Sequence, residues 1–214
     1  MRLLRSGLLV IALATLGCAR EASRAEAQGT MERLAPGESA TVAGVTITMN
    51  RKQAGMQDAD GWYSATSSGG RFRVRMPVPF NDFSTTTPIA GDVPVIYDAI
   101  GGKSSEGARF GAICFRKEAS TFPPKDWVAD TRQSLANKMP GLKFVPVQHN
   151  GVSGERLEAV TQSGVVYSGL LLVSGGRACQ VSVEYPHAHE ADLGEVAKMF
   201  LDSFEFLPEA PSPK

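Results

Sequence analysis

The sequence has no long hydrophobic run, no excess of one charge and only three cysteines. Its apolar N-terminal stretch, LLVIALATLGCA at residues 8–19, holds twelve residues, whereas a helix needs about 20 to cross the hydrocarbon core of a bilayer. Basic and acidic residues number 22 each, so the basic surplus typical of nucleic-acid-binding proteins is missing. We therefore expect no nucleic-acid partner, and we do not interpret the apolar stretch as a membrane-spanning helix.

The composition is that of one soluble domain with a hydrophobic core, because 43% of the residues are hydrophobic and 21% are charged. Local changes in composition divide the chain into four parts. We predict a signal peptide at residues 1–18, a flexible tether at 19–37, a single domain at 38–208 and a disordered, proline-broken tail at 209–214.

The N-terminal segment has the pattern of a secretory signal. Arg2 and Arg5 precede the apolar stretch, as in the basic and hydrophobic regions of such signals. The stretch ends in TLGC, residues 15–18, which resembles the lipobox of bacterial lipoproteins. Lipoproteins carry a diacylated cysteine at this position, so the resemblance implies that Cys18 becomes a lipidated N-terminus. Thr15 and Leu16 stand in interchanged order relative to the usual lipobox.

A second cleavage site competes with this one. Ala25 and Ala27 fit an A-x-A pattern before Gln28, although the preceding stretch, REASRAEA, is longer and more charged than is usual there. Cleavage at Cys18 gives an exported, membrane-anchored bacterial lipoprotein that faces the periplasm, which is the location we predict. Cleavage before Gln28 gives a soluble secreted or periplasmic protein.

The other two cysteines form an even pair once Cys18 is lipidated, and an exported protein meets an oxidising compartment. Cys114 and Cys179 lie in the strand-like stretches ARFGAICFRKE and RACQVSVEY. A disulfide requires these strands to bring the two Cα atoms within about 7 Å of each other. The sequence leaves two interpretations open, a disulfide or two separately buried thiols.

Hydrophobic periodicity predicts an α+β fold. Strand-like alternation covers residues 40–50, a hairpin at 61–77, a second hairpin around residues 94–118, and three further strands between residues 155 and 185. Two stretches have helical periodicity. The first, at 124–139, lies between the second hairpin and the last three strands, and the second, at 191–206, follows the last strand. The run GLLLV at 169–173 is apolar on both faces, so we expect an antiparallel sheet with helices packed on both faces.

Taken together, the stretches GGRFRVRMPVP, DWVADTRQSL, GERLEAV, LLLVSGGRACQVSVEYP and FLDSFEF resemble the PsbP-like fold. DcrB-type and LpqN-type bacterial lipoproteins have this fold, and the resemblance extends from about Gly61 to Leu207. It implies an α/β/α sandwich in an exported, lipid-anchored protein that acts in binding or assembly. It implies no shared catalytic residues.

A weak metal-binding pattern follows the last predicted strand. His187 and His189 could offer two imidazoles to zinc, with Glu190 or Asp192 as the carboxylate. The H-x-H spacing is not that of a closed structural zinc site, and a polar loop that leads into a helix contains such residues in any case. Asp192 could instead cap that helix.

The sequence indicates no enzyme. It has no G-x-S-x-G motif, and both candidate thiols lie within strands. We predict no catalytic residue and no cofactor. We expect a non-enzymatic binding or assembly factor of the bacterial cell envelope, with another envelope protein as its partner and with membrane contact through the N-terminal lipid. A lipoprotein that binds a small molecule or a metal is the alternative, and an enzyme ranks third.

Overall fold

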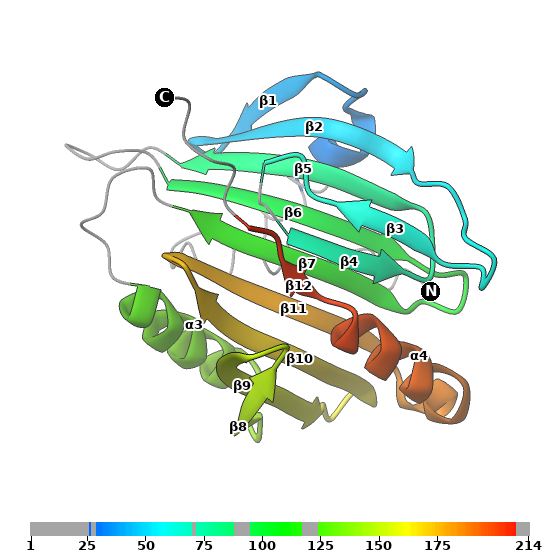
Figure 1. Ribbon diagram of the computed structural model, residues 1–214, viewed down its shortest axis with the longest axis vertical. Coiled ribbons are helices and arrows are strands. Elements are labelled where there is room, and N and C mark those ends of the chain that lie inside the picture. The colour runs from blue at the N-terminus through cyan, green and yellow to red at the C-terminus, as the bar shows by residue number, and fades with distance from the viewer. Residues whose placement is uncertain (1–25, 27–28, 70–71, 88–94, 117–123, 209–214) are drawn as a thin grey trace.

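The computed structural model describes Glu26 and residues 29–69, 72–87, 95–116 and 124–208. Cys18, both predicted signal cleavage sites and the predicted tail at 209–214 lie outside these residues. Nine antiparallel strands form the main sheet (Figure 1). In spatial order they are β1 (Ser39–Val42), β2 (Val45–Ala54), β5 (Phe80–Thr87), β6 (Val95–Lys103), β7 (Arg109–Arg116), β11 (Arg177–Pro186), β10 (Val165–Ser174), β9 (Val152–Val160) and β8 (Lys143–His149).

A second, smaller sheet lies over part of one face of the main sheet. It consists of β12 (Glu205–Phe206), β4 (Phe72–Met76) and β3 (Tyr63–Thr66) in that order. Phe72, Val74 and Met76 of β4 alternate with arginines, and all three are fully buried against the main sheet. Period-two alternation thus gives β4 one apolar face and one charged face.

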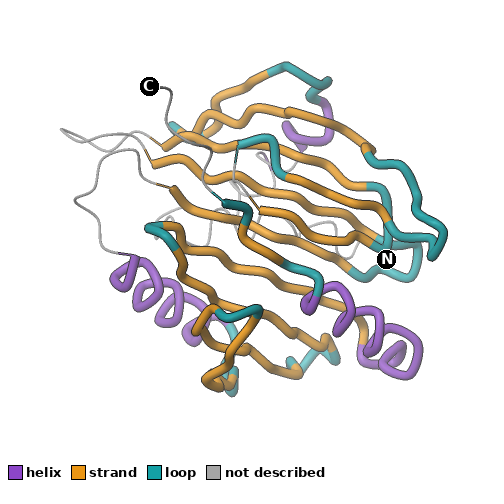
Figure 2. Tube along the Cα trace, viewed as in Figure 1, coloured by secondary structure: helices purple, strands orange, loops and turns teal. Residues whose placement is uncertain are grey.

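Two helices pack on opposite faces of the main sheet, next to β10 and β11. Trp127 and Leu135 of α3 (Pro124–Lys138) join the hydrophobic cluster on one face. Phe200 and Leu201 of α4 (Glu190–Asp202) join the cluster on the other face, which the small sheet shares. Figure 2 shows how far strands outweigh helices in the described residues.

The predicted antiparallel sheet is therefore confirmed, whereas the predicted sandwich with helices on both faces overstates the helices. The cover on the α4 face is largely the small sheet. The central strand β10 is buried on both faces, as its sequence predicted, because Leu170 and Leu172 join one cluster and Leu171 the other.

Several strands differ from the sequence prediction, and β12 (Glu205–Phe206) lies in a stretch predicted as the end of a helix. Residues 40–50 were predicted as one strand, but Ala43 and Gly44 have φ of 49° and 81° and form the turn of a β1–β2 hairpin. β5 occupies a stretch that was predicted as a loop. The strand was missed because the buried Asp82 interrupts its apolar pattern. β8 was missed because it is an edge strand with Pro146 at its centre.

The predicted flexible tether at 19–37 is too long. Residues 29–33 are helical, and the side chains of Met31 and Leu34 are buried in the same cluster as α3. The Lys52 ammonium on β2 donates hydrogen bonds of 2.7 and 3.0 Å to the carbonyl oxygens of Glu32 and Leu34. The chain therefore joins the folded domain at the β1–β2 edge of the sheet.

No helix in the described part of the chain is long and apolar enough to cross a membrane.

Candidate functional site

Cys114 and Cys179 face each other directly across β7 and β11 and form a disulfide. Their Cα atoms are 4.1 Å apart, and the two sulfurs are joined at 2.01 Å. Both side chains are buried, with 2% and 0% exposure. Of the two interpretations that the sequence left open, the structure contains the bridge. The sulfurs are out of contact with solvent, so the disulfide serves here as a covalent link between two central strands.

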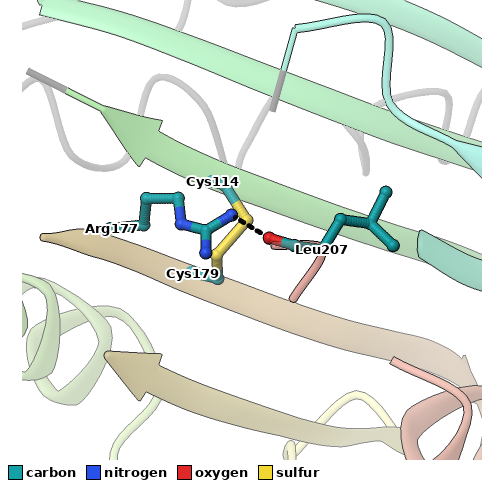
Figure 3. The surroundings of a disulfide bond; sticks show 4 residues. All are labelled: Cys114, Arg177, Cys179 and Leu207. Carbon is teal, nitrogen blue, oxygen red and sulfur yellow. Dashed lines mark hydrogen bonds between the residues drawn. A yellow bond between two sulfur atoms is a disulfide. The ribbon is translucent and has the colours of Figure 1, made fainter. Parts of the chain in front are cut away.

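The C-terminal strap, residues 203–208, crosses the same face beside this disulfide (Figure 3). The Arg177 guanidinium donates a hydrogen bond of 3.0 Å to the Leu207 carbonyl oxygen and lies 5.1 Å from the centre of the Phe206 ring. Figure 3 shows Arg177 and Leu207 next to the two sulfurs. The strap is therefore held at the disulfide by a charge-assisted hydrogen bond and a cation–π contact.

The strap is also fixed at the β8–β9 turn. The His149 Nε2 atom lies 2.7 Å from the Phe204 carbonyl oxygen, and the Asn150 side-chain amide donates to the same oxygen at 2.9 Å. Phe204 is fully buried, and its ring packs 5.6 Å from that of Phe72 on β4. The strap thus joins the edge of the main sheet to the small sheet and closes the hydrophobic cluster on this face.

The predicted metal ligands do not form a group of three. His187 and His189 form a short 3-10 helix, η1 (His187–His189), and their surroundings differ. The His187 Nδ1 atom lies 3.8 Å from a Glu190 carboxylate oxygen, with both side chains at least half exposed. His189 lies near the β6–β7 turn: the pKa of Glu106 there is lowered, first by the Ser105 hydroxyl and to a smaller extent by His189.

No group of three or more histidine, cysteine, aspartate or glutamate side chains in the described residues could hold a metal. The prediction that His187, His189 and Glu190 form a ligand set is thus not met by their placement. The suggested capping role of Asp192 is also wrong. His189 is the N-cap residue of α4 and makes no side-chain capping bond, and Asp192 lies within the first turn of the helix.

An open groove lies between α4 and the outer strands of the main sheet, and we call it the α4 groove. Its volume is about 550 Å³. Gly194, Ala197 and Lys198 line the α4 wall, and Lys143, Arg156 and Val160 on β8 and β9 line the floor. The groove exists because α4 covers β10 and β11 and leaves this face of β8 and β9 open to solvent.

Tyr185, the last inward-facing residue of β11, forms the inner end of the groove. Its hydroxyl donates a hydrogen bond to Glu190 at the start of α4. Burial, together with this hydrogen bond and the negative charge of Glu190, raises the pKa of Tyr185 to about 12. The phenol therefore stays protonated at neutral pH and keeps its role as a donor.

Gly194 lies next to this pair. A Cβ atom at this position would lie 3.2 Å from a Glu190 carboxylate oxygen and 3.9 Å from the Tyr185 hydroxyl. Glycine inside a helix costs about 1 kcal/mol relative to alanine. Gly194 thus weakens α4 at the turn that faces the Tyr185 hydroxyl.

Charges of both signs alternate around the groove. On the floor, Lys143 of β8 pairs in register with Glu158 of β9. On the wall, the Lys198 ammonium lies 2.7 Å from Asp202, and the Arg156 guanidinium reaches the same aspartate at 4.0 Å. The basic side chains therefore already have acidic neighbours, so the groove does not concentrate one sign of charge.

Sequence reasoning found only the His187 and Glu190 side of this groove and interpreted it as a metal site. The floor was missed because β8 was missed. One signal was present in the sequence: a glycine in the middle of the amphipathic stretch ADLGEVAKMFLDSFEF is unfavourable for a helix, and it indicates a position where a side chain would interfere.

No protein-family model and no curated protein sequence matches the chain. Two solved structures are similar to it. Cyanobacterial PsbP (CyanoP) from Synechocystis sp. shares 8% identity over 72% of this chain and 96% of its own, with a TM-score of 0.40. LpqN, which is involved in cell envelope biogenesis of Mycobacterium tuberculosis, shares 12% identity over 76% of this chain and 84% of its own, with a TM-score of 0.35. Both belong to the group that the sequence resemblance named. Similarity at this level carries no inference about function.

Proposed function

We propose that the protein is an exported, lipid-anchored and non-enzymatic binding or assembly factor of a bacterial cell envelope. The observation that supports this most is the buried disulfide between Cys114 and Cys179. Disulfides form and persist in oxidising compartments and are rare in the cytosol. The disulfide thus agrees with the basic and apolar segments at the N-terminus, which have the pattern of an export signal.

The anchor rests on Cys18 at the end of the apolar stretch. One acyl chain gives only marginal membrane binding, whereas two chains give stable anchoring. The diacyl modification implied by the lipobox resemblance would therefore hold the domain at a membrane surface. A binding role fits the described residues better than catalysis, because their polar clusters either fix the fold, as at the strap, or line an open groove.

Two matched variants test the anchor. In a bacterial host, Cys18→Ser should abolish partition of the full-length protein into detergent, and Ala27→Leu should leave it unchanged. Intact mass of the mature protein should show acyl groups on Cys18. The opposite pattern, with Ala27→Leu blocking cleavage and an unmodified N-terminus at Gln28, would refute the lipoprotein.

The size of the α4 groove favours one alternative, a lipoprotein that binds a small molecule. Its volume of about 550 Å³ falls within the range of small-molecule sites, about 300–1,000 Å³. Thermal melting of the purified protein with and without a dialysed small-molecule extract of the host tests it. A rise in melting temperature that Val160→Glu abolishes would favour this alternative over a protein partner.

A further inference from the structure

We propose that the Cys114–Cys179 disulfide and the strap, residues 203–208, form a redox switch. The strap covers the bond in the oxidised protein, and reduction of the bond by a dithiol loosens the strap. The switch requires neither the lipid anchor nor a binding partner, so its test is independent of the proposed function.

Within the sheet, buried residues close off the two sulfurs on both sides. Asp98 on β6 stands directly opposite Cys114, and Leu172 on β10 stands directly opposite Cys179. Both flanking residues are fully buried, and both lie on central strands that are paired on each side. A reductant can therefore approach the bond only from above the face to which the sulfurs point, which is the face under the small sheet and the strap.

On that face, Arg177 and the strap lie next to the sulfurs (Figure 3). Arg177 is two residues from Cys179 on β11, so both side chains stand on the same face. Its guanidinium donates the 3.0 Å hydrogen bond to the Leu207 carbonyl oxygen and contacts the Phe206 ring. Arg177 and the strap together therefore form the cover of the disulfide.

The outer part of the strap, residues 205–208, is held more weakly than the rest of this face. β12 has two residues, pairs with β4 on one side and stands at the edge of the small sheet. Residues 205–207 are half-buried, whereas Phe204 is fully buried. The ion pair of Glu205 with Arg73 is partly exposed and therefore weak. Segments with few buried contacts open at a lower free energy than the whole fold, so we expect this part to open first.

Opening of the strap allows thiol–disulfide exchange with a dithiol. A thiolate of the dithiol attacks one protein sulfur, the bond between the two cysteines breaks, and the other protein sulfur leaves as a thiolate. The second thiol of the reductant then displaces the first protein sulfur from the mixed disulfide. The dithiol is oxidised to a disulfide, and its two electrons and two protons end on Cys114 and Cys179 as two thiols.

Reduction increases the room that the two sulfurs need. Two thiol sulfurs are not bonded to each other, so they separate to van der Waals contact, and each carries an added hydrogen. Asp98 and Leu172 block this movement within the sheet, and a close-packed core accommodates added volume poorly. The sulfurs therefore move toward Arg177 and the strap, which weakens the bond to Leu207 and loosens the strap.

Hydrogen–deuterium exchange of the purified full-length wild type tests the coupling. In the oxidised protein, the strap amides should exchange faster than those of β7 and β11, because the strap opens without the sheet. In excess dithiothreitol, exchange of the strap amides should become about tenfold faster or more, since a hydrogen bond to a charged group is weakened. Strap amides that exchange at the same rate in both forms, or only together with β7 and β11, would overturn the switch.

The rate of reduction by dithiothreitol under native conditions, followed with a thiol reagent, tests the cover. Arg177→Met should raise the rate constant by about tenfold or more, because the hydrogen bond to Leu207 is lost. Arg132→Met is the matched control and should leave the rate constant unchanged. Arg132 on α3 also makes an ion pair, 2.9 Å from Glu155, and a cation–π contact, 4.9 Å from the centre of the Phe144 ring, but on the opposite face of the sheet.

Equal acceleration by Arg177→Met and Arg132→Met would mean that reduction follows a general loss of stability, and it would overturn the role of the strap as a cover. A wild-type disulfide that dithiothreitol reduces only after the protein is unfolded in urea would overturn the switch as well. The exchange measurement needs no variant, so it tests the switch even if Arg177→Met folds poorly.

Discussion

The two ends of strand β11 carry side chains on the same face of the sheet but have different surroundings. Cys179, Val181, Val183 and Tyr185 alternate along this face, and all four are buried. At the Cys179 end, the disulfide, Arg177 and the C-terminal strap close the surface. At the Tyr185 end, α4 begins, and a groove opens between it and the outer strands.

The comparison shows that the elements packed over a strand, and not its own pattern of apolar residues, decide what its side chains can do. The same row of inward-facing residues on β11 holds a disulfide at one end and, at the other, a tyrosine hydroxyl that lines a groove. The strap seals its end because its carbonyl oxygens bond to the side chains of His149, Asn150 and Arg177. At the other end, α4 leaves the outer strands β8 and β9 uncovered, and the groove stays open. The Cys179 end is therefore closed and covalently linked, whereas the Tyr185 end borders an open groove.

Removal of the disulfide should have the largest effect on stability. The double variant Cys114→Ala, Cys179→Ala should unfold at a lower urea concentration, since the bridge spans 65 residues, and closure of such a loop contributes about 4 kcal/mol in the chain-entropy model. Urea denaturation of the oxidised wild type and the double variant measures the difference. A loss below about 1 kcal/mol would show that the bridge does little to restrict the unfolded chain.

The strap should have the next largest effect. Arg177→Met keeps the length of the apolar stem but loses the hydrogen bond to Leu207 and the contact with the Phe206 ring, so we expect a loss of about 2 kcal/mol. Arg73→Met is the control, because the Arg73 side chain contacts the strap through a partly exposed ion pair with Glu205 and its loss should cost less than about 1 kcal/mol. Arg177→Met should also speed reduction of the native disulfide by dithiothreitol. Equal losses in the two variants would contradict the special role of Arg177.

The strands that the sequence predicted are those whose own apolar pattern matches their burial. β4 alternates between buried and more exposed residues, whereas β10 and β11 are apolar enough to be buried on both faces along most of their length. The apolar face of α4 was predicted in the same way. β5 could not be predicted, because its buried Asp82 is acceptable only through bonds to distant residues. The Arg51 guanidinium lies 2.7 Å from that carboxylate, and Ser68 also donates to it. A prediction from hydrophobic periodicity alone therefore assigns a loop at this polar residue.

The candidate site was less predictable than the fold for a related reason. Whether Cys114 and Cys179 meet depends on the register of β7 and β11, which are 65 residues apart along the chain. The α4 groove depends on where a helix stops covering a sheet, which no local pattern encodes. Gly194 alone marked it in the sequence, and a helical glycine has several explanations until its neighbours are known.

Alkaline pH should destabilise the Tyr185 end. The pKa of Tyr185 is about 12 in the folded protein against a usual 10.0, so the folded state holds a proton that the unfolded state releases. The stability that the buried phenol contributes is fully present below pH 10 and is lost as the pH rises toward 12. Burial also raises the pKa of Tyr167, so Tyr185→Phe should reduce this loss without abolishing it. Urea unfolding below pH 10 and near pH 12 measures both slopes, and equal slopes in the wild type and the variant would rule out Tyr185 as a cause.

Chelation should have the smallest effect, although it acts at the same end of β11. The His187 imidazole and the Glu190 carboxylate lie 3.8 Å apart and are exposed to solvent, whereas zinc binds its nitrogen and oxygen ligands at about 2.0–2.2 Å and usually takes four of them. Glu190 is also engaged by the Tyr185 hydroxyl, so a metal would have to compete with that hydrogen bond. The melting temperature of the purified protein should therefore stay the same when EDTA is added, and His187→Ala should behave as the wild type does. A fall that zinc restores, and that His187→Ala removes, would mean that this end of β11 binds a metal and that the groove serves it.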